Sequence, residues 1–273
     1  MSSYNVRLYR YADSVQLRIY NRPIISNEAV RPVKEPAGIS EQLFCSDVRT
    51  QDEAERCQKS SKSRTVQEMY EITRANRWSY FVTLTFDPKK IDSTDYDLLS
   101  CKTSKWLNNL KSRYAPDLKY ILVPELHKDG KKFHFHALIA NTGNLQLSFS
   151  GKVAVGKRIY DYHRKPFGTK IYNLSNWKYG FSTATAVSDS SRVASYITKY
   201  ITKDLCTLTK GKKRYWVSKN VDRAEISYMT LAYEDIQTII QNNLSSVGHM
   251  STCRVSDAGL EVMFIEINGG VLI

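Results

Sequence analysis

Two histidines separated by one residue are the strongest sign of chemistry in this sequence. His134 and His136 lie in the apolar run 133–140, and alternate side chains of a β-strand point to the same face. Both imidazoles would then project together and could share one metal ion. At a mixed nitrogen and oxygen site, Mg²⁺ or Mn²⁺ acts as a Lewis acid on a phosphodiester.

A third ligand is predicted just before the two histidines. Asp129 and Gly130 indicate a two-residue hairpin turn, and the resulting register puts Glu125 directly opposite His134. Directly opposite residues have Cβ atoms about 4.5–5.5 Å apart. Glu125 is therefore the predicted third ligand, and His127, on the same face, is the alternative. Ordinary polar histidines are the competing interpretation, but three of the five histidines gather here beside a glutamate.

A second reactive group recurs at helical spacing. Tyr196 and Tyr200 are four residues apart, and each precedes a lysine by three residues, Lys199 and Lys203. On one helix all four would share a face. A tyrosyl oxygen is a poor nucleophile because its pKa is about 10, but a neighbouring ammonium favours the phenolate. The pattern predicts tyrosines that attack phosphate and form phosphotyrosine; a solvated helix face is the alternative.

The elements that position these groups follow one another through the middle of the chain. Strands are predicted from β-branched and aromatic runs at 80–86, 118–126, 133–140 and 181–187. Helices are predicted from apolar spacing at 61–76, from Ser93 or Thr94 to about Tyr114, and at 190–205. This order predicts an α+β fold, a ferredoxin-like (RRM-like) antiparallel sheet with helices on it.

The sequence outside this region predicts two extensions. Residues 1–77 form an N-terminal extension with a hairpin over 4–22, a loop and the first helix. Residues 78–206 form the central domain. Residues 207–273 form a basic C-terminal extension with a helix near 233–242 and a strand over 260–267.

The charge of the chain points to a nucleic-acid partner. Lys and Arg total 40 against 27 Asp and Glu, which gives a net charge of +13 and a pI near 9.4. Seven basic residues beside the reactive groups are the predicted DNA contacts, although solvated loops are the alternative for those after 207: Lys128, Lys131, Lys132, Lys210, Lys212, Lys213 and Arg214.

Other classes of protein are disfavoured. The five cysteines form no C-x-x-C pair, which argues against a zinc ribbon or a disulfide framework. No apolar run approaches the about 18–20 residues that span a bilayer, and the N-terminus has no signal-peptide pattern. We therefore expect a cytoplasmic protein, in the host cell if it is phage-encoded, without a membrane partner.

Three segments in this order resemble a known family. Residues 80–86, the His134-Phe135-His136 strand and residues 196–203 look like motifs I, II and III of HUH-superfamily rolling-circle replication initiators. The likeness is closest to the replication-associated proteins of single-stranded DNA phages and related phage or plasmid elements, in the two-tyrosine class. It covers about residues 78–206.

The resemblance implies a function and a set of roles. The family nicks single-stranded origin DNA, forms a 5′-phosphotyrosine link and a free 3′-hydroxyl, and later rejoins the strand. Its metal site maps onto His134, His136 and Glu125, and its nucleophiles map onto Tyr196 and Tyr200. In a single-nucleophile alternative Tyr196 is the predicted one, because single-tyrosine relatives place a lysine three residues after the nucleophile.

The chain departs from some family members in having no good P-loop. Residues 151–157 match G-x-x-x-x-G-K, but Arg158 replaces the Ser or Thr that would hold Mg²⁺, so we reject nucleotide binding there. A separate helicase and the host polymerase are therefore expected partners. The alternatives are a relaxase or single-strand transposase of the same superfamily, or a non-catalytic DNA-binding protein. Relaxases typically place the tyrosine before the histidines, whereas here it follows them.

Overall fold

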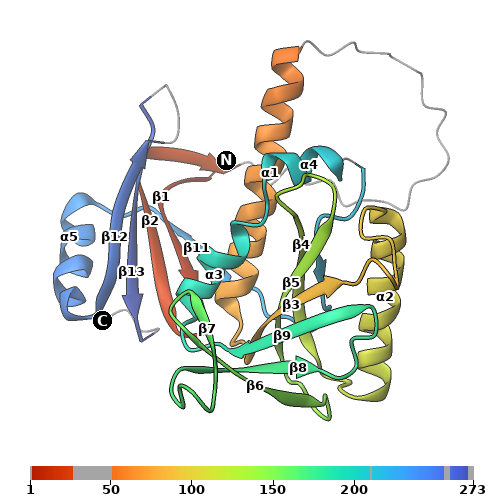
Figure 1. The fold of residues 1–273 in the computed structure, drawn as a ribbon. Coiled ribbons are helices and arrows are strands. Elements are labelled where there is room, and N and C mark those ends of the chain that lie inside the picture. Colours follow the sequence, from red (N-terminus) through yellow and green to blue (C-terminus); the bar gives the residue numbers. More distant parts are fainter. Residues whose placement is uncertain (1, 27–50, 210, 255–258, 270–273) are drawn as a thin grey trace. The chain divides into compact units, whose positions relative to one another are not determined.

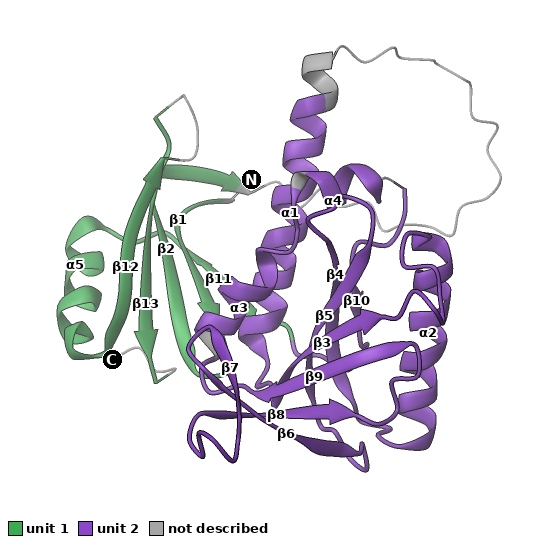
Figure 2. Cartoon of the chain, in the orientation of Figure 1, with its two compact units in different colours: residues 1–50, 223–273 green, residues 51–222 purple. Residues whose placement is uncertain are grey.

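The computed structural model describes residues 2–26, 51–209, 211–254 and 259–269. Figure 2 shows the two compact units into which the chain divides: unit 1 comprises residues 1–50 and 223–273, and unit 2 comprises residues 51–222. Each unit has its own antiparallel sheet and its own hydrophobic core. The predicted α+β class is confirmed.

Unit 2 is built on an eight-stranded antiparallel sheet with the order β10-β4-β5-β3-β9-β8-β6-β7 (Figure 1). Its strands are β3 (Tyr80–Phe86), β4 (Lys119–Leu126), β5 (Phe133–Ala140), β6 (Leu147–Val155), β7 (Arg158–Asp161), β8 (Thr169–Leu174), β9 (Gly180–Ala186) and β10 (Trp216–Val217). The four predicted strands are confirmed as β3, β4, β5 and β9. The ferredoxin-like detail stays a prediction, since β6, β7 and β8 lie between β5 and β9 in the chain.

The central strands alternate between two differently covered faces. In β3, Val82, Leu84 and Phe86 are buried, whereas Phe81, Thr83 and Thr85 are half-buried on the opposite face. Figure 1 shows helix α2 (Tyr96–Arg113) on one side of the sheet, and helices α1 (Gln51–Ala75), α3 (Ser190–Thr198) and α4 (Lys203–Leu208) on the other.

Aromatic rings fill the space between α2 and the sheet. Trp106 of α2 meets Trp177 at 5.0 Å between ring centroids, and Phe86 meets both Trp177 and Phe135 within 5.2 Å. Phe86 and Phe135 therefore fix the α2 face, and their chain neighbours Thr85, His134 and His136 point to the other face.

The N-terminal cap of α2 differs from the prediction. Asp95, rather than Ser93 or Thr94, caps the helix, and its side chain accepts hydrogen bonds from the backbone N–H groups of Asp97 and Leu98. The Thr94 hydroxyl instead donates to Asp92 at 2.7 Å in a turn before the helix. Two aspartates thus divide the roles of turn and cap.

The single helix predicted over 190–205 is wrong. Helix α3 ends at Thr198, and α4 begins at Lys203. The Thr198 hydroxyl donates to the carbonyls of Ala194 and Ser195, while Thr202 is extended and its side chain caps α4 by accepting from the Leu205 N–H. Threonine hydroxyls compete with helical hydrogen bonds in this way and favour caps. Tyr200 consequently lies in a turn, outside the helix that carries Tyr196.

The segment that matched a P-loop pattern forms a β-hairpin. Gly151 belongs to β6, and the register pairs Val155 with Arg158, so Gly156 and Lys157 make a two-residue turn into β7. Gly156 has a φ of +60°, which glycine adopts without strain. A strand and its turn replace the loop and helix that cradle phosphates, so the rejection of nucleotide binding agrees with the fold.

Unit 1 joins residues from both ends of the described chain. Its strands, in the order β11-β1-β2-β13-β12, are β1 (Ser2–Arg10), β2 (Ser14–Ser26), β11 (Glu225–Met229), β12 (Val247–Arg254) and β13 (Glu261–Asn268). Helix α5 (Tyr233–Asn242) packs Ile236 on a core that includes Leu17 and Ile265. The hairpin, helix and final strand predicted outside the central domain are confirmed; the three-part division at 77 and 206 stays a prediction.

Candidate functional site

Three strands bring the predicted metal ligands to one patch of the sheet. The β4–β5 register pairs Glu125 with His134 and Val123 with His136, which confirms the register inferred from the Asp129-Gly130 turn. On the other side of β5, β3 places Thr83 opposite His136 and Thr85 opposite His134. We call Glu125, His134 and His136 the histidine patch.

Each histidine of the patch is held by a threonine hydroxyl. Thr83 Oγ1 lies 3.2 Å from His136 Nδ1, and Thr85 Oγ1 lies 3.2 Å from His134 Nδ1. A hydroxyl both donates and accepts, so it suits either tautomer of the imidazole. The two contacts leave the Nε2 atoms to face Glu125 or a ligand, as supporting partners of metal-binding histidines do.

The remaining contacts of the patch are direct side-chain contacts. His136 Nε2 lies 2.6 Å from Glu125 Oε2, and the His134 ring stacks on His127 at 5.0 Å between centroids. Within the described residues, no group of three or more His, Cys, Asp or Glu side chains is arranged so that it could hold a metal ion. The donor types still fit, because two supported imidazoles and one carboxylate share one face, and metal binding stays a prediction.

The electrostatics of the patch favour an ionised carboxylate and neutral imidazole. The hydrogen bond with His136 is the main cause that holds the pKa of Glu125 below its usual value. Burial, followed by the charge of His127, lowers the pKa of His134. Ionised carboxylate and neutral imidazole are the forms that bind metal ions.

The two predicted nucleophiles reach the patch in different ways. Tyr200 stacks on His136 with 3.8 Å between ring centroids and an angle of 11°. Tyr196 lies edge-on to both Tyr200, at 5.4 Å, and Phe81, at 5.2 Å. Burial, followed by a hydrogen bond with Tyr196, raises the pKa of Tyr200 well above its usual range, whereas the Tyr196 side chain is 47% exposed.

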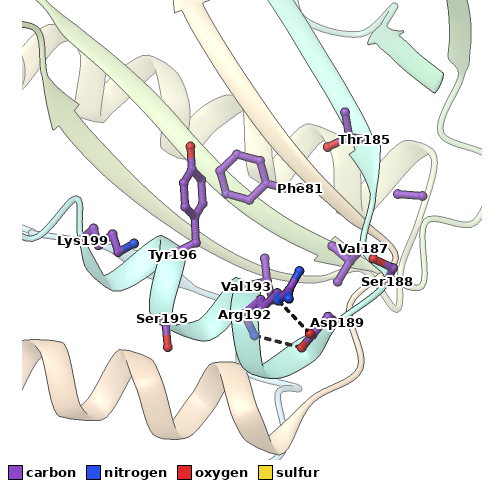
Figure 3. A pocket seen from close by; sticks show the side chains of 11 residues that line it. Phe81, Thr185, Val187, Ser188, Asp189, Arg192, Val193, Ser195, Tyr196 and Lys199 are labelled. Atoms are coloured by element: carbon purple, nitrogen blue, oxygen red, sulfur yellow. Dashed lines mark hydrogen bonds and ion pairs between the residues drawn. The ribbon is translucent and has the colours of Figure 1, made fainter. Parts of the chain in front are cut away.

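A pocket of about 620 Å³ opens beside Tyr196 (Figure 3). Phe81, Val187 and Val193 give it apolar walls, and hydroxyl groups and charged side chains complete its lining. Arg192 and Asp189 form an ion pair at 3.4 Å at its rim. Lys199 also lines the pocket, with its Nζ 5.9 Å from the centre of the Tyr196 ring.

Residues 79–205, which contain the patch, both tyrosines and the pocket, match the family of the replication-associated protein ORF2. The chain is a replication-associated protein. Comparisons with curated proteins and with solved structures gave no match. The likeness to a replication-associated family inferred from the motifs is thereby confirmed, whereas the two-tyrosine class stays a prediction. No helix in the described parts of the replication-associated protein is long and apolar enough to cross a membrane.

The predicted DNA contacts divide into two groups. Lys128, Lys131 and Lys132 are exposed in the hairpin loop that follows Glu125. In the second group, Lys212 forms an ion pair with Asp97 at 2.6 Å, and Arg214 donates to Ser61 at 2.7 Å. Lys213 is exposed, Lys210 lies outside the described residues, and the side chain of Lys203 is not described.

Several residues of the site are not apparent from spacing alone. Thr83 and Thr85 lie in the strand that resembles motif I, and their alternation with Val82 and Leu84 was the available signal for one shared face. The contact of Phe81 with Tyr196 depends on how α3 packs on β3, which no local pattern in the sequence encodes.

Proposed function

We propose that this replication-associated protein nicks single-stranded DNA at an origin and rejoins the cut strand in rolling-circle replication. The observation that supports the proposal is the meeting of two tyrosines with the histidine patch inside the residues that match the family. Tyr200 stacks on His136, and Tyr196 contacts Tyr200 at the edge of an open pocket.

The proposed reaction is a transesterification. A tyrosyl oxygen attacks phosphorus, and the bond between phosphorus and the 3′ oxygen breaks. The 5′ end stays on the enzyme as phosphotyrosine, and the 3′ oxygen leaves and takes up a proton as a free 3′-hydroxyl. Rejoining is the reverse reaction, in which a 3′-hydroxyl attacks the phosphotyrosine and releases the phenol.

The surroundings of the two tyrosines favour Tyr196 for the first cut. Its ring is exposed in the pocket, and the ammonium of Lys199 beside it favours the phenolate and offsets charge on the phosphate. Tyr200 is held protonated by burial and is covered by His136, so it suits a later step or a positioning role. Lys203 is the corresponding proposed partner of Tyr200.

A divalent ion fits the donor types of the patch. We propose that His134, His136 and Glu125, with His127 as the alternative third ligand, hold Mg²⁺ or Mn²⁺. When bound, the ion supplies Lewis-acid polarisation of the scissile phosphate. Thr83 and Thr85 would orient the imidazoles for this purpose.

Other proteins would complete replication. The hairpin at residues 151–161 offers no nucleotide site, so a separate helicase would unwind the duplex. The host polymerase would extend the 3′-hydroxyl in the cytoplasm. Lys128, Lys131 and Lys132 are proposed to contact the DNA that enters the patch.

The test of the nucleophiles is to trap covalent adducts on origin DNA and identify the modified residue by mass spectrometry. Tyr196→Phe and Tyr200→Phe should each leave an adduct on the other tyrosine, with the greater loss of initial cutting in Tyr196→Phe, and the double variant should leave none. Tyr179→Phe, a half-buried tyrosine that packs on Trp177, is the matched control. An adduct that persists in the double variant would refute the proposal.

The test of the metal is its removal. His134→Ala and His136→Ala should abolish cleavage without unfolding the chain, and EDTA should do the same until Mn²⁺ or Mg²⁺ is restored. If His127→Ala is inactive while Glu125→Ala is active, His127 is the third ligand. Full cleavage in EDTA would exclude a catalytic metal.

A further inference from the structure

The hairpin of β6 and β7 carries aromatic rings and lysines that the nicking site does not use. Lys165 Nζ lies 4.3 Å from the ring centre of Tyr160 and 4.9 Å from that of Phe167. Lys170 Nζ lies 5.7 Å from the ring centres of both Phe149 and Tyr162, which meet edge-on at 5.4 Å. We call these six residues the aromatic–lysine cluster: Phe149, Tyr160, Tyr162, Lys165, Phe167 and Lys170.

The register places this cluster on the face of the sheet opposite the histidine patch. Phe149 pairs with Tyr172, Tyr172 with Ala184, and Ala184 with Val82, which belongs to the α2 face. Lys170 is two residues from Tyr172 and shares its face. Strand β7 is the last strand of the sheet, four strand steps or about 19 Å from β3. The cluster is therefore separate from the tyrosine pocket.

The composition of the hairpin is unusual for a surface that meets only water. Six basic residues stand in 147–174 against one acidic residue, Asp161: Lys152, Lys157, Arg158, Arg164, Lys165 and Lys170. Asp161 is used in the local turn, where its carboxylate accepts the His163 N–H. Phe167 is nevertheless 61% exposed and Phe149 is 42% exposed. Lysines beside exposed rings match the phosphates and base faces of a single strand.

We propose that the aromatic–lysine cluster is a second binding surface for single-stranded DNA, remote from the nicking site. Bases stack on Phe167 and Phe149, and phosphates pair with Lys165 and Lys170. The identity of the strand rests on the proposed function: it is the DNA on one side of the nick. A DNA that covers only the tyrosine pocket does not reach this surface, whereas a longer strand engages both.

The experiment measures binding apart from cleavage. The full chain carrying Tyr196→Phe and Tyr200→Phe is titrated by fluorescence anisotropy with labelled thymidine oligonucleotides. One oligonucleotide has about 30 nucleotides, beyond the about 4–16 that a single-strand-binding fold covers, and one has about 6. Phe167→Leu should weaken binding of the long strand about fivefold or more and leave the short strand unchanged. Phe167→Tyr, which keeps the ring, should bind like the parent.

The lysines are tested through salt dependence. Lys165→Ala with Lys170→Ala should lower the slope of log affinity against log salt by about 1.4, at about 0.7 per phosphate contact. The control removes two exposed cations of α1, Arg56→Ala with Lys59→Ala. Equal slopes for the two double variants, or unchanged affinity in Phe167→Leu, would overturn the proposal. So would loss of binding to anionic lipid vesicles with unchanged DNA binding, which would assign the surface to a membrane.

The proposed function and this inference fail in different ways. Loss of long-strand affinity in Phe167→Leu supports the second surface even if no adduct forms. Normal adduct formation at saturating DNA in the same single variant, with both tyrosines present, separates the surface from the chemistry. Adduct formation with unchanged affinity retains the nicking function and rejects the second surface.

Discussion

Replacing Thr85 by valine tests whether the threonines of β3 orient the histidine patch. Valine keeps the shape of the side chain and removes the hydroxyl that lies 3.2 Å from His134 Nδ1. The direct loss of one hydrogen bond is about 0.5–1.5 kcal/mol. Loss of ring orientation adds to this, because supporting partners of metal-binding histidines are typically worth about 10–100-fold in affinity or activity.

The two threonines should differ in their effect. His136 is also held by Glu125 at 2.6 Å, by the Tyr200 ring at 3.8 Å and by Phe81 at 5.6 Å, whereas His134 is stacked on the half-exposed His127. Thr85→Val should therefore weaken Mn²⁺ binding and cleavage about tenfold or more, within the range for such partners. Thr83→Val should cost about 2- to 10-fold, as for the hydrogen bond alone.

Isothermal titration with Mn²⁺ gives the metal affinity, and adduct formation on origin DNA gives the activity. Thr183→Val is the matched control, since Thr183 pairs with Thr83 across β9 on the same face and has no histidine hydrogen bond in the described residues. A Thr85→Val chain with unchanged metal affinity, or one affected less than Thr83→Val, would refute the orienting role.

Two further predictions concern stability. Gly180→Ala should lower the free energy of unfolding by about 1–3 kcal/mol, because a Cβ there would lie 2.1 Å from the Thr85 carbonyl oxygen; urea denaturation that matches the parent would contradict the close approach. The lowered pKa of His134 means that the unfolded chain binds more protons, so stability should fall as the pH drops below about 6.5, and the lowered pKa of Glu125 should add a further loss below about 4.5. Denaturation at pH 7.5 and 5.5 should show a smaller difference for His134→Gln than for the parent, and an equal difference would exclude His134 as the cause.

The strands of the site could be predicted because their signals are local. β-branched and aromatic residues recur in β3 and β5, and the Asp129-Gly130 turn fixes one register for the hairpin. A slip of one residue would reverse the faces of the whole strand, so the pairing of Glu125 with His134 followed once the turn was placed. The face that carries the histidines was therefore available from the sequence.

Long-range pairing had no such signal. β2 ends at Ser26 and pairs with β13, which begins at Glu261, and nothing local in either segment names the other. The sequence therefore suggested two separate extensions, where the structure joins them in one sheet. The aromatic–lysine cluster was hidden for a related reason, because it depends on the irregular register between Phe149 and Lys152 that lets β6 pair with β8.

The break between α3 and α4 changes what the two tyrosines can do. Apolar and polar residues keep helical spacing through Lys203, so periodicity alone predicts one helix with both tyrosines on an equivalent face. The hydroxyls of Thr198 and Thr202 end that helix and turn Tyr200 onto His136, while Tyr196 stays in the open pocket. Two nucleophiles in unlike surroundings are not interchangeable at the start of a reaction. The exposed tyrosine meets DNA first, and the covered one becomes available only when its contact with His136 opens, which gives an order to the two cuts that a replication round requires.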